Sequence, residues 1–588
     1  MTIARNKTRT ASPVRASSSH SPRGRFANLD DDKLRGGYYT SEKVAAWLCD
    51  WAIQSTEDVV LEPSCGDGAF LEAATRRFRA LGATPTKIAR LLTGVEIIPA
   101  EAQSAIDRLR PELGKAAEKV VHNSDFFAWW QESDQPAFDA IIGNPPFIRY
   151  QSFPEPHRTR AMAIMGDQGL TPNRLTNIWV PFVVAATASL KRGGRLALVL
   201  PAEILQVTYA AQLRSFLADH FARIDVIACN ELFFENAEQE VVLLLADGAL
   251  ASASEKNECR VTLTAAKTVS DITKKKPAHL LKHAEPKTIR HDSEKWLKYF
   301  LDNRQITFMR ALREADIASP LSAHASIDVG VVTGKNEFFV LSADQVLALG
   351  LEGYTTPLVS RSAHLKGGRL GKADWKSLAA AGDRVHLLNI SRVQAAGKLS
   401  AKLRRYIDEG EQKQFHQGYK CSIRKPWYLV PSVWVPDGFA FRQIYDFPRM
   451  VLNTADATST DTIHRLRSLG AKPERIIANT YTWLTAASAE IEGRSYGGGV
   501  LELEPTEAER LLMPARLNGA MPLTEVDQLI RAGRLEAVLE ENARVILRDH
   551  MGLSATDCAL LKGVWTMMRD RRHSRRRGAG KAAQDNNP

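Results

Sequence analysis

The chain has 588 residues, of which 44% are hydrophobic and 25% are charged, and its formal net charge is +11 at pH 7. Since these proportions are ordinary for a globular protein and no run of about 18 apolar residues occurs, we expect a globular protein without a membrane span. The widely spread cysteines favour a reducing, cytoplasmic setting. The six cysteines form no CxxC pair, which excludes zinc ribbons and a secreted disulfide framework, whereas the positive charge suits a polyanionic partner such as a nucleic acid.

The N-terminal part of the sequence predicts a tail followed by an α/β domain. Residues 1–34 are rich in Ser and Arg and predict a disordered basic tail. Residues 35–250 alternate short apolar runs with amphipathic stretches, which is typical of βαβ units and predicts a parallel sheet between helices. The expected strands lie at 59–62, 92–96, 120–122, 138–142, 195–200 and 238–246.

The remaining sequence predicts four more segments. Residues 251–300 are polar and predict a connector. From 301 to 515, short β-like runs rich in Trp, Tyr and Pro predict a separate mixed α+β domain. Residues 516–568 predict a helical segment, and the arginine-rich stretch 569–588 predicts a basic disordered tail.

Three motifs in the first domain predict a site for an adenosine-containing cofactor. An apolar strand ending at Glu62 runs into a turn with Gly66 and Gly68, where a ligand can approach the backbone closely. The next strand ends at Glu96, a position where an acid commonly accepts hydrogen bonds from ribose hydroxyls. Asp125 could then accept from an adenine amino group while Phe126 packs on the ring. Each motif alone also fits a packing turn or a surface acid, so the prediction depends on their order.

The segment Asn144-Pro145-Pro146-Phe147 at the end of the strand 138–142 is the most informative in the chain. An adenine amino nitrogen is a poor nucleophile, because its lone pair is delocalised into the ring. The Asn144 side chain and the Pro145 carbonyl could accept both N–H hydrogens and favour a pyramidal nitrogen, and the prolines hold these acceptors rigidly. Phe147 could stack on the base. A Pro-Pro turn capped by an aromatic residue is the structural alternative.

In this order the motifs resemble the catalytic domain of gamma-class N6-adenine DNA methyltransferases of restriction-modification systems. The resemblance covers residues 36–246 and implies a Rossmann-like, seven-stranded class I domain that binds S-adenosylmethionine, with no metal. It assigns catalysis to Asn144, Pro145, Pro146 and Phe147. The cofactor-binding residues that it implies are Tyr39, Thr40, Glu62, Pro63, Cys65, Gly66, Gly68, Glu96, Asp125 and Phe126.

The resemblance extends to the target base and to the second domain. It implies that Phe233 or Phe234, of which Phe233 is the better match by spacing, holds a flipped base together with Phe147, although a core aromatic fits as well. Val329–Asn336, Lys425–Tyr428 and Arg494–Gly499 resemble blocks of target-recognition domains, with basic and aromatic side chains suited to phosphates and base edges. Packing turns are the alternative for each block. The family more often has Asp at the position of Glu62.

These inferences predict a site-specific adenine N6-methyltransferase of bacterial or phage origin that acts on double-stranded DNA and protects it in a restriction-modification system. Because the C-terminal part shows no Asp…Glu-x-Lys cluster, we expect any cognate endonuclease to be a separate chain. Three alternatives stay open. They are an RNA or protein methyltransferase with the same tetrapeptide, an inactive DNA-binding protein, and N4-cytosine methylation. The sequence leaves the recognition site and the oligomeric state undetermined.

Overall fold

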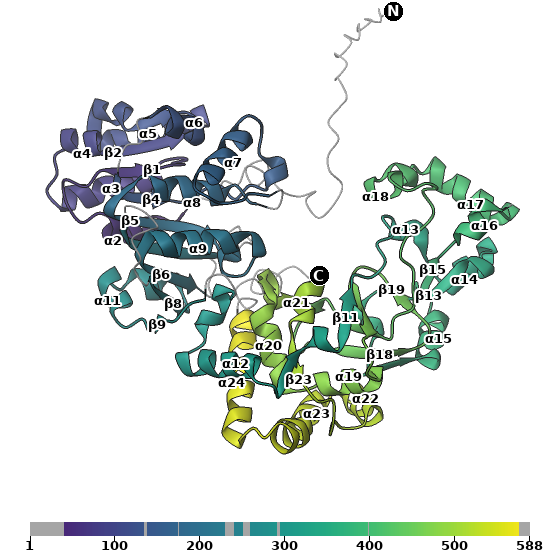
Figure 1. Ribbon diagram of the computed structural model, residues 1–588. Coiled ribbons are helices and arrows are strands. Elements are labelled where there is room, and N and C mark those ends of the chain that lie inside the picture. The colour runs from purple at the N-terminus through teal and green to yellow at the C-terminus, as the bar shows by residue number, and fades with distance from the viewer. Residues whose placement is uncertain are drawn as a thin grey trace, which may run out of the picture.

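The computed structural model describes residues 40–133, 138–173, 176–229, 240–250, 259–290, 294–397 and 399–574. Two lobes face each other across an open side and are joined at the base by a helical body (Figure 1). The helical body includes α12 (Asn303–Glu314), α20 (Trp483–Glu492) and α24 (Ala555–Ser574). Among the helices of the described ranges, none has the length and hydropathy needed to cross a lipid bilayer.

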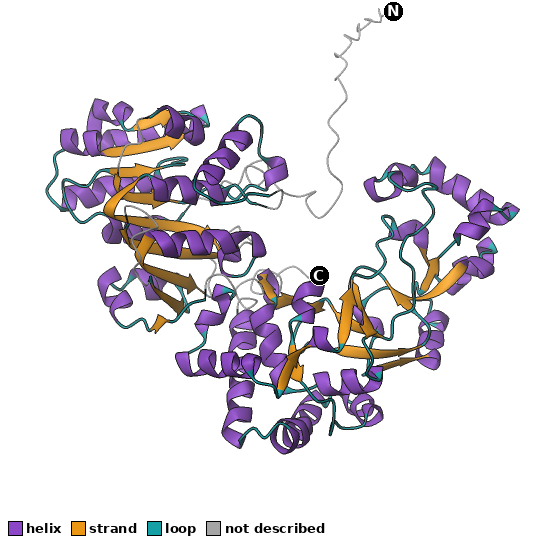
Figure 2. Ribbon diagram, viewed as in Figure 1, coloured by secondary structure: helices purple, strands orange, loops and turns teal. Residues whose placement is uncertain are grey.

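The first lobe is built on one nine-stranded sheet in the order β3-β2-β1-β4-β5-β7-β6-β8-β9. Figure 2 shows this sheet with helices packed around it. The strands are β1 (Val60–Glu62), β2 (Leu92–Glu96), β3 (Val121–Asn123), β4 (Phe138–Gly143), β5 (Leu190–Pro201), β6 (Phe221–Cys229), β7 (Val241–Ala249), β8 (Arg260–Ala266) and β9 (Pro286–Lys287). The helices are α2 (Glu42–Ala52), α3 (Ala69–Ala80), α4 (Pro85–Leu91), α5 (Pro99–Leu113), α6 (Phe126–Glu132), α7 (His157–Asp167), α8 (Trp179–Ala188), α9 (Ala211–His220), α10 (Val269–Thr273) and α11 (Pro277–Lys282).

The strand order creates a switch point beside β1. The chain proceeds from β1 outward to β2 and β3, returns to β4 on the other side of β1, and continues to β5, all in parallel. β7 then inserts antiparallel between β5 and β6. In open α/β sheets, ligands bind at the carboxyl ends of the strands next to such a switch point. The Rossmann-like class that the resemblance implied is confirmed.

The sheet extends beyond the seven predicted strands, into the stretch 251–300 that we interpreted as a connector. β8 pairs in parallel with β6 along its length, and β9 pairs with β8. Val261 and Leu263 of β8 are buried and alternate with Thr262 and Thr264. This alternation lowers the mean hydropathy of the segment. Its sequence therefore looks polar, and the outer strand was not predicted. The connector prediction is therefore wrong for 260–287.

The second lobe carries a five-stranded sheet, β11-β20-β16-β18-β14, a four-stranded sheet, β12-β15-β13-β19, and a three-stranded sheet, β17-β22-β21. The strands are β10 (Ala318–Pro320), β11 (Ala325–Asp328), β12 (Val340–Leu341), β13 (Thr355–Val359), β14 (Arg369–Gly371), β15 (His386–Leu388), β16 (Gly438–Phe441), β17 (Gln443–Ile444), β18 (Met450–Thr454), β19 (Thr458–Ser459), β20 (Ile463–Ser468), β21 (Arg494–Tyr496), β22 (Val500–Glu502) and β23 (Leu512–Pro514). The other helices are α13 (Asn336–Phe339), α14 (Ala343–Leu349), α15 (Lys372–Ala380), α16 (Arg392–Ala396), α17 (Ala401–Gln412), α18 (Tyr419–Ser422), α19 (Pro473–Thr480), α21 (Pro505–Glu509), α22 (Leu523–Arg531) and α23 (Leu535–Asn542). The second half of the chain is thus the predicted mixed α+β arrangement.

The C-terminal helix α24 corrects the predicted tail 569–588, because it runs to Ser574 and is partly core. Arg572 is only 1% exposed, and its guanidinium pairs with Glu490 of α20 at 2.6 Å. The same guanidinium donates to the carbonyls of Tyr445 and Gly499. One arginine of the stretch that we predicted to be a solvated tail therefore forms a buried ion pair, which holds α24 against α20. Residues 575–588 lie outside the described ranges.

A side chain of the first lobe is hydrogen-bonded to the backbone of the second. Gln206, which follows β5, donates from Nε2 to the Ser495 carbonyl at 2.7 Å, and its Oε1 accepts from the Ser495 N–H at 2.8 Å. Both residues are buried. The side-chain amide of Gln206 thus makes the same pair of hydrogen bonds to β21 that the backbone of a neighbouring strand would make. It connects two lobes that are formed by distant parts of the sequence.

Candidate functional site

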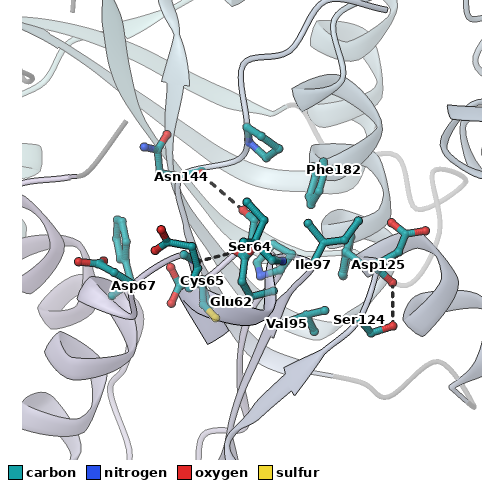
Figure 3. Close-up of a pocket in the computed structure, with 18 of the residues that line it drawn as sticks. Glu62, Ser64, Cys65, Asp67, Val95, Ile97, Ser124, Asp125, Asn144 and Phe182 are labelled. Atoms are coloured by element: carbon teal, nitrogen blue, oxygen red, sulfur yellow. Dashed lines mark hydrogen bonds between the residues drawn. The ribbon is translucent and has the colours of Figure 1, made fainter. Parts of the chain in front are cut away.

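A cavity of about 320 Å³ opens at the carboxyl ends of β1, β2, β3 and β4, next to the switch point of the sheet. Figure 3 shows Asp67 and Asn144 on one side of it and Asp125 and Phe182 on the other. Its volume is within the range of pockets that hold small ligands. The predicted site residues that line it are Thr40, Glu62, Pro63, Cys65, Gly66, Glu96, Asp125, Phe126, Asn144 and Pro146.

Three further predicted site residues that the structure describes do not line the cavity. Gly68, Pro145 and Phe147 are not among the lining residues, and Phe147 is only 9% exposed. Tyr39 and Phe233 lie outside the described residues. Among the described residues, no group of three His, Cys, Asp or Glu side chains could hold a metal ion.

The glycine turn after β1 is connected to the end of β2 through the Glu96 carboxylate. Gly66 donates its N–H to Glu96 Oε2 at 2.9 Å, and Ile98 donates to Oε1 at 2.8 Å. Gly66 has φ +51°, and the space where its Cβ would lie is open. A ligand can therefore approach this backbone, and Glu96 retains further lone pairs for hydroxyl donors.

Two other glycines are required by close packing. Gly68 has φ +86°, and a Cβ there would lie 2.9 Å from the Ala105 Cα of α5. Gly143, the last residue of β4, has φ +144°, and a Cβ would lie 3.3 Å from the Glu62 Cγ. The glycine at 68 thus lets α3 pack against α5, and the one at 143 brings the Asn144 turn next to Glu62.

Two buried polar atoms in the cavity wall have no hydrogen-bond partner within the described part of the chain. They are Oε2 of Glu62, whose residue is 2% exposed, and Oγ1 of Thr40. Burial raises the pKa of Glu62 well above its usual range, and the negative charges of Asp67 and Glu96 raise it further. Because unsatisfied buried polar groups are costly, this wall fits a ligand that brings an ammonium group to Glu62 and an acceptor to Thr40.

The opposite side of the cavity combines one carboxylate with apolar side chains. Asp125 caps α6 by accepting from the N–H groups of Phe127 and Ala128, and its Oδ2 lies 2.9 Å from His157 Nδ1. The ring of Phe126 stacks on that of Phe182, with centroids 5.1 Å apart. A flat, apolar slot edged by a carboxylate suits a purine ring with an amino group.

Sequence reasoning missed three residues of this wall. Ile97 is 45% exposed although it is aliphatic, and Phe153 and Phe182 line the same cavity from the segment before α7 and from α8. The sequence did carry a signal for Ile97. It directly follows Glu96, the acid that ends β2, and a residue in that position leaves the sheet at the edge where the cavity opens. No local signal marked Phe153 or Phe182, since their place depends on how α7 and α8 pack.

Asn144 is half-buried at the carboxyl end of β4, and the Ser64 hydroxyl donates to its backbone carbonyl at 3.4 Å. The Asn-Pro-Pro-Phe turn and the glycine turn are therefore neighbours across the adjacent strands β4 and β1. A group held by the wall of Glu62 would lie beside the Asn144 turn.

The three blocks of the second lobe are partly structural. A Cβ at Gly330 would lie 1.9 Å from the Thr460 carbonyl, so close packing requires this glycine. Trp427 is buried and donates from Nε1 to Glu411 at 2.9 Å. Ser495 is the residue that pairs with Gln206. In each block at least one residue therefore serves packing or the connection between lobes.

Two protein families match this chain. "Eco57I restriction-modification methylase" matches residues 86–233, and "Type II methyltransferase M.Eco57I, C-terminal domain" matches residues 293–547. Together they span parts of both lobes.

Similar proteins are found over most of the length. Type II methyltransferase M.AccI of Acinetobacter calcoaceticus is 21% identical over 83% of this chain and 86% of its own length. M.XamI of Xanthomonas campestris pv. amaranthicola is 23% identical over 86% and 90%. M.TthHB8I of Thermus thermophilus is 33% identical over 32% and 40%. Among solved structures, the Type IIL restriction-modification enzyme MmeI in complex with DNA aligns over 93% of this chain and 73% of its own, with 13% identity and a TM-score of 0.49.

Proposed function

The chain is a DNA methyltransferase of the restriction-modification type, and from this premise we propose that it methylates the N6 amino group of a specific adenine in double-stranded DNA. The methyl donor of this family is S-adenosylmethionine, which when bound supplies an activated methyl group on a sulfonium. The observation that carries the proposal is the Asn144 turn at the end of β4, directly beside the cavity wall of Glu62.

The cavity residues fit the parts of this cofactor. Glu62 Oε2 and Thr40 Oγ1, which lack partners within the described residues, would hold the ammonium and carboxylate of its amino-acid end. Glu96 would accept from the ribose hydroxyls beside Gly66. Asp125 would accept from the adenine amino group, with the ring between Ile97 and the Phe126–Phe182 pair.

At the target base, the Asn144 side chain and the Pro145 carbonyl would accept the two N–H hydrogens of the amino group. This orients the nitrogen lone pair toward the cofactor site, and the fixed backbone of the two prolines keeps the reorganisation small. No strong base is needed, because the nitrogen loses its proton after it has gained the methyl group. An adenine cannot reach this site within the duplex, so we propose that it is flipped out and stacks on Phe233. Because Phe147 is only 9% exposed, its ring would contact the base only after the Asn144 turn moves.

Double-stranded DNA is the proposed partner, held on the open side between the lobes. The net charge of +11 supports this partner, because basic side chains gain from releasing phosphate counterions. We propose that the methylation protects host DNA from a restriction endonuclease encoded as a separate chain.

The test is methylation-sensitive long-read sequencing of plasmid DNA from a methylation-free bacterial host that expresses the chain. We expect N6-methyladenine at one short motif, and none with Asn144→Ala. Asn144→Asp keeps one acceptor oxygen and should retain a fraction of the activity, which separates a loss of chemistry from a loss of folding. N4-methylcytosine in place of N6-methyladenine would refute the adenine assignment, and unmodified DNA with soluble protein would refute the proposed reaction.

A further inference from the structure

Two arginines of β20 lie against one tryptophan in the five-stranded sheet of the second lobe. The guanidinium carbons of Arg465 and Arg467 are each 4.4 Å from the centroid of the Trp434 ring. The two arginines are two positions apart on a strand, so their side chains leave the same face of the sheet. The resemblance to known families assigned none of these three residues a role.

Arg465 has a structural role. It is 4% exposed, and it donates to the Val329 carbonyl at 2.9 and 3.1 Å and to the Ser432 carbonyl at 2.7 Å. These bonds hold the segment before β16 and the segment after β11 against β20. Trp434 is therefore fixed in place by a neighbour whose donors are already used.

Arg467 is the opposite case. Its side chain is exposed, and within the described part of the chain its guanidinium makes no hydrogen bond or ion pair, only the contact with Trp434. In the ladder it is opposite Ser326, whereas the exposed Asp328 is opposite Arg465. The ring thus restricts the rotamers of Arg467 while its N–H donors stay free, at a small entropic cost for later binding.

The surroundings of Arg467 select the kind of acceptor. A free guanidinium fork matches two acceptors side by side, such as O6 and N7 of guanine in the major groove or two phosphate oxygens. Three exposed residues near this site are aliphatic, Val329, Val435 and Leu469, and the exposed Asp328 on β11 carries a negative charge that would disfavour a phosphate. Aliphatic side chains can contact base edges such as the thymine methyl group, but they give nothing to a phosphate. β11, the partner strand of β20, lies on the inner side of the second lobe, toward the first lobe (Figure 1).

We propose that Arg467, held by Trp434, reads a guanine in the recognition sequence of this enzyme. The inference rests on the proposed function in one respect, that the substrate is DNA. It goes beyond it by naming a residue that determines specificity.

The test compares Arg467→Ala and Arg467→Lys with the wild-type chain in the methylation-free host, on plasmids that carry the recognition motif and all of its single-base variants. Arg392→Ala is the matched control, since Arg392 is also exposed and begins α16 on the outer edge of the same lobe. With Arg467→Ala we expect discrimination at one guanine position to fall about 5- to 150-fold, with the other positions unchanged. The lysine should recover only part, because it lacks the planar fork. Arg392→Ala should change nothing.

Two results would overturn the proposal. An equal loss at every position, with the salt dependence of DNA binding reduced by about one unit of slope, would indicate a phosphate contact. Unchanged discrimination would indicate a surface residue without a role in recognition. Retained S-adenosylmethionine binding by the purified variants shows that the fold is intact. A failure of the proposed function is visible separately, because the wild-type chain would then methylate no motif.

Discussion

Replacing Glu62 with glutamine is the most direct test of the cavity. The substitution keeps the shape of the side chain and removes its charge. In the structure Glu62 Oε2 is buried without a partner within the described residues, and we propose that it meets the ammonium group of the cofactor. A hydrogen bond between charged groups is worth about 1.5–3 kcal/mol, which corresponds to about 10- to 150-fold in affinity. Isothermal titration calorimetry of Glu62→Gln should therefore show S-adenosylmethionine binding weakened by that factor.

The same substitution has an opposite effect on the free protein. Burial raises the folded-state pKa of Glu62, so above the unfolded pKa the unfolded chain releases a proton that the folded chain retains. Stability is therefore lost as the pH rises from the unfolded pKa toward the folded one. Glu62→Gln removes this loss, and its melting temperature without cofactor should exceed that of the wild type at pH 8 and differ little near pH 4.

The control is Glu132→Gln, which makes the same charge change at an exposed position of α6. It should leave cofactor affinity and melting temperature unchanged. Wild-type binding should also release protons, seen as a dependence of the calorimetric enthalpy on the buffer, and Glu62→Gln should not. Cofactor affinity within twofold of wild type, or a lower melting temperature at pH 8, would refute the reasoning about Glu62.

Two further predictions concern buried polar contacts between distant segments, Gln206 with Ser495 and Arg572 with Glu490. Gln206→Ala removes two buried hydrogen bonds to the backbone of Ser495, at about 1–3 kcal/mol each. Limited proteolysis should cut between the lobes faster, while cofactor affinity stays unchanged, and an unaltered cleavage rate would contradict this role. Arg572→Met leaves Glu490 as an unpaired buried charge, at about 3–5 kcal/mol in urea unfolding. The double variant Arg572→Met with Glu490→Met should regain most of that loss, and a double variant as unstable as the single one would show that the pair itself is required.

The central part of the sheet was predictable because its signals are local. β1, β2 and β4 are short apolar runs, each followed by the residue that the chemistry needs, such as Glu96 or the Asn144 turn. In a parallel sheet the carboxyl ends of neighbouring strands meet at one edge. Once a Rossmann-like parallel sheet was inferred, residues far apart in sequence could be expected at one edge of it.

The two wrong predictions, the connector at 260–287 and the tail from residue 569, also have a physical reason. β8 alternates valine and leucine with threonine, and a threonine is as acceptable in a buried strand as on a surface. Arg572 has the composition of a solvated tail, and only the distant Glu490 makes its burial possible. The composition of a segment does not show which distant residues it will contact. β8 is stabilised by pairing with β6, and the end of α24 by the ion pair with Glu490.

The sequence alone therefore determined the class of the fold and placed the glycine turn, Glu96 and the Asn-Pro-Pro-Phe turn at the ends of strands, because each of these motifs lies in consecutive residues around one strand end. Only the tertiary structure decided which side chains complete the cavity, how Gln206 joins the lobes, and that Arg467 keeps its donors free beside Trp434. Those features are contacts between segments up to 289 positions apart, and no local pattern specifies which distant residue will be the neighbour.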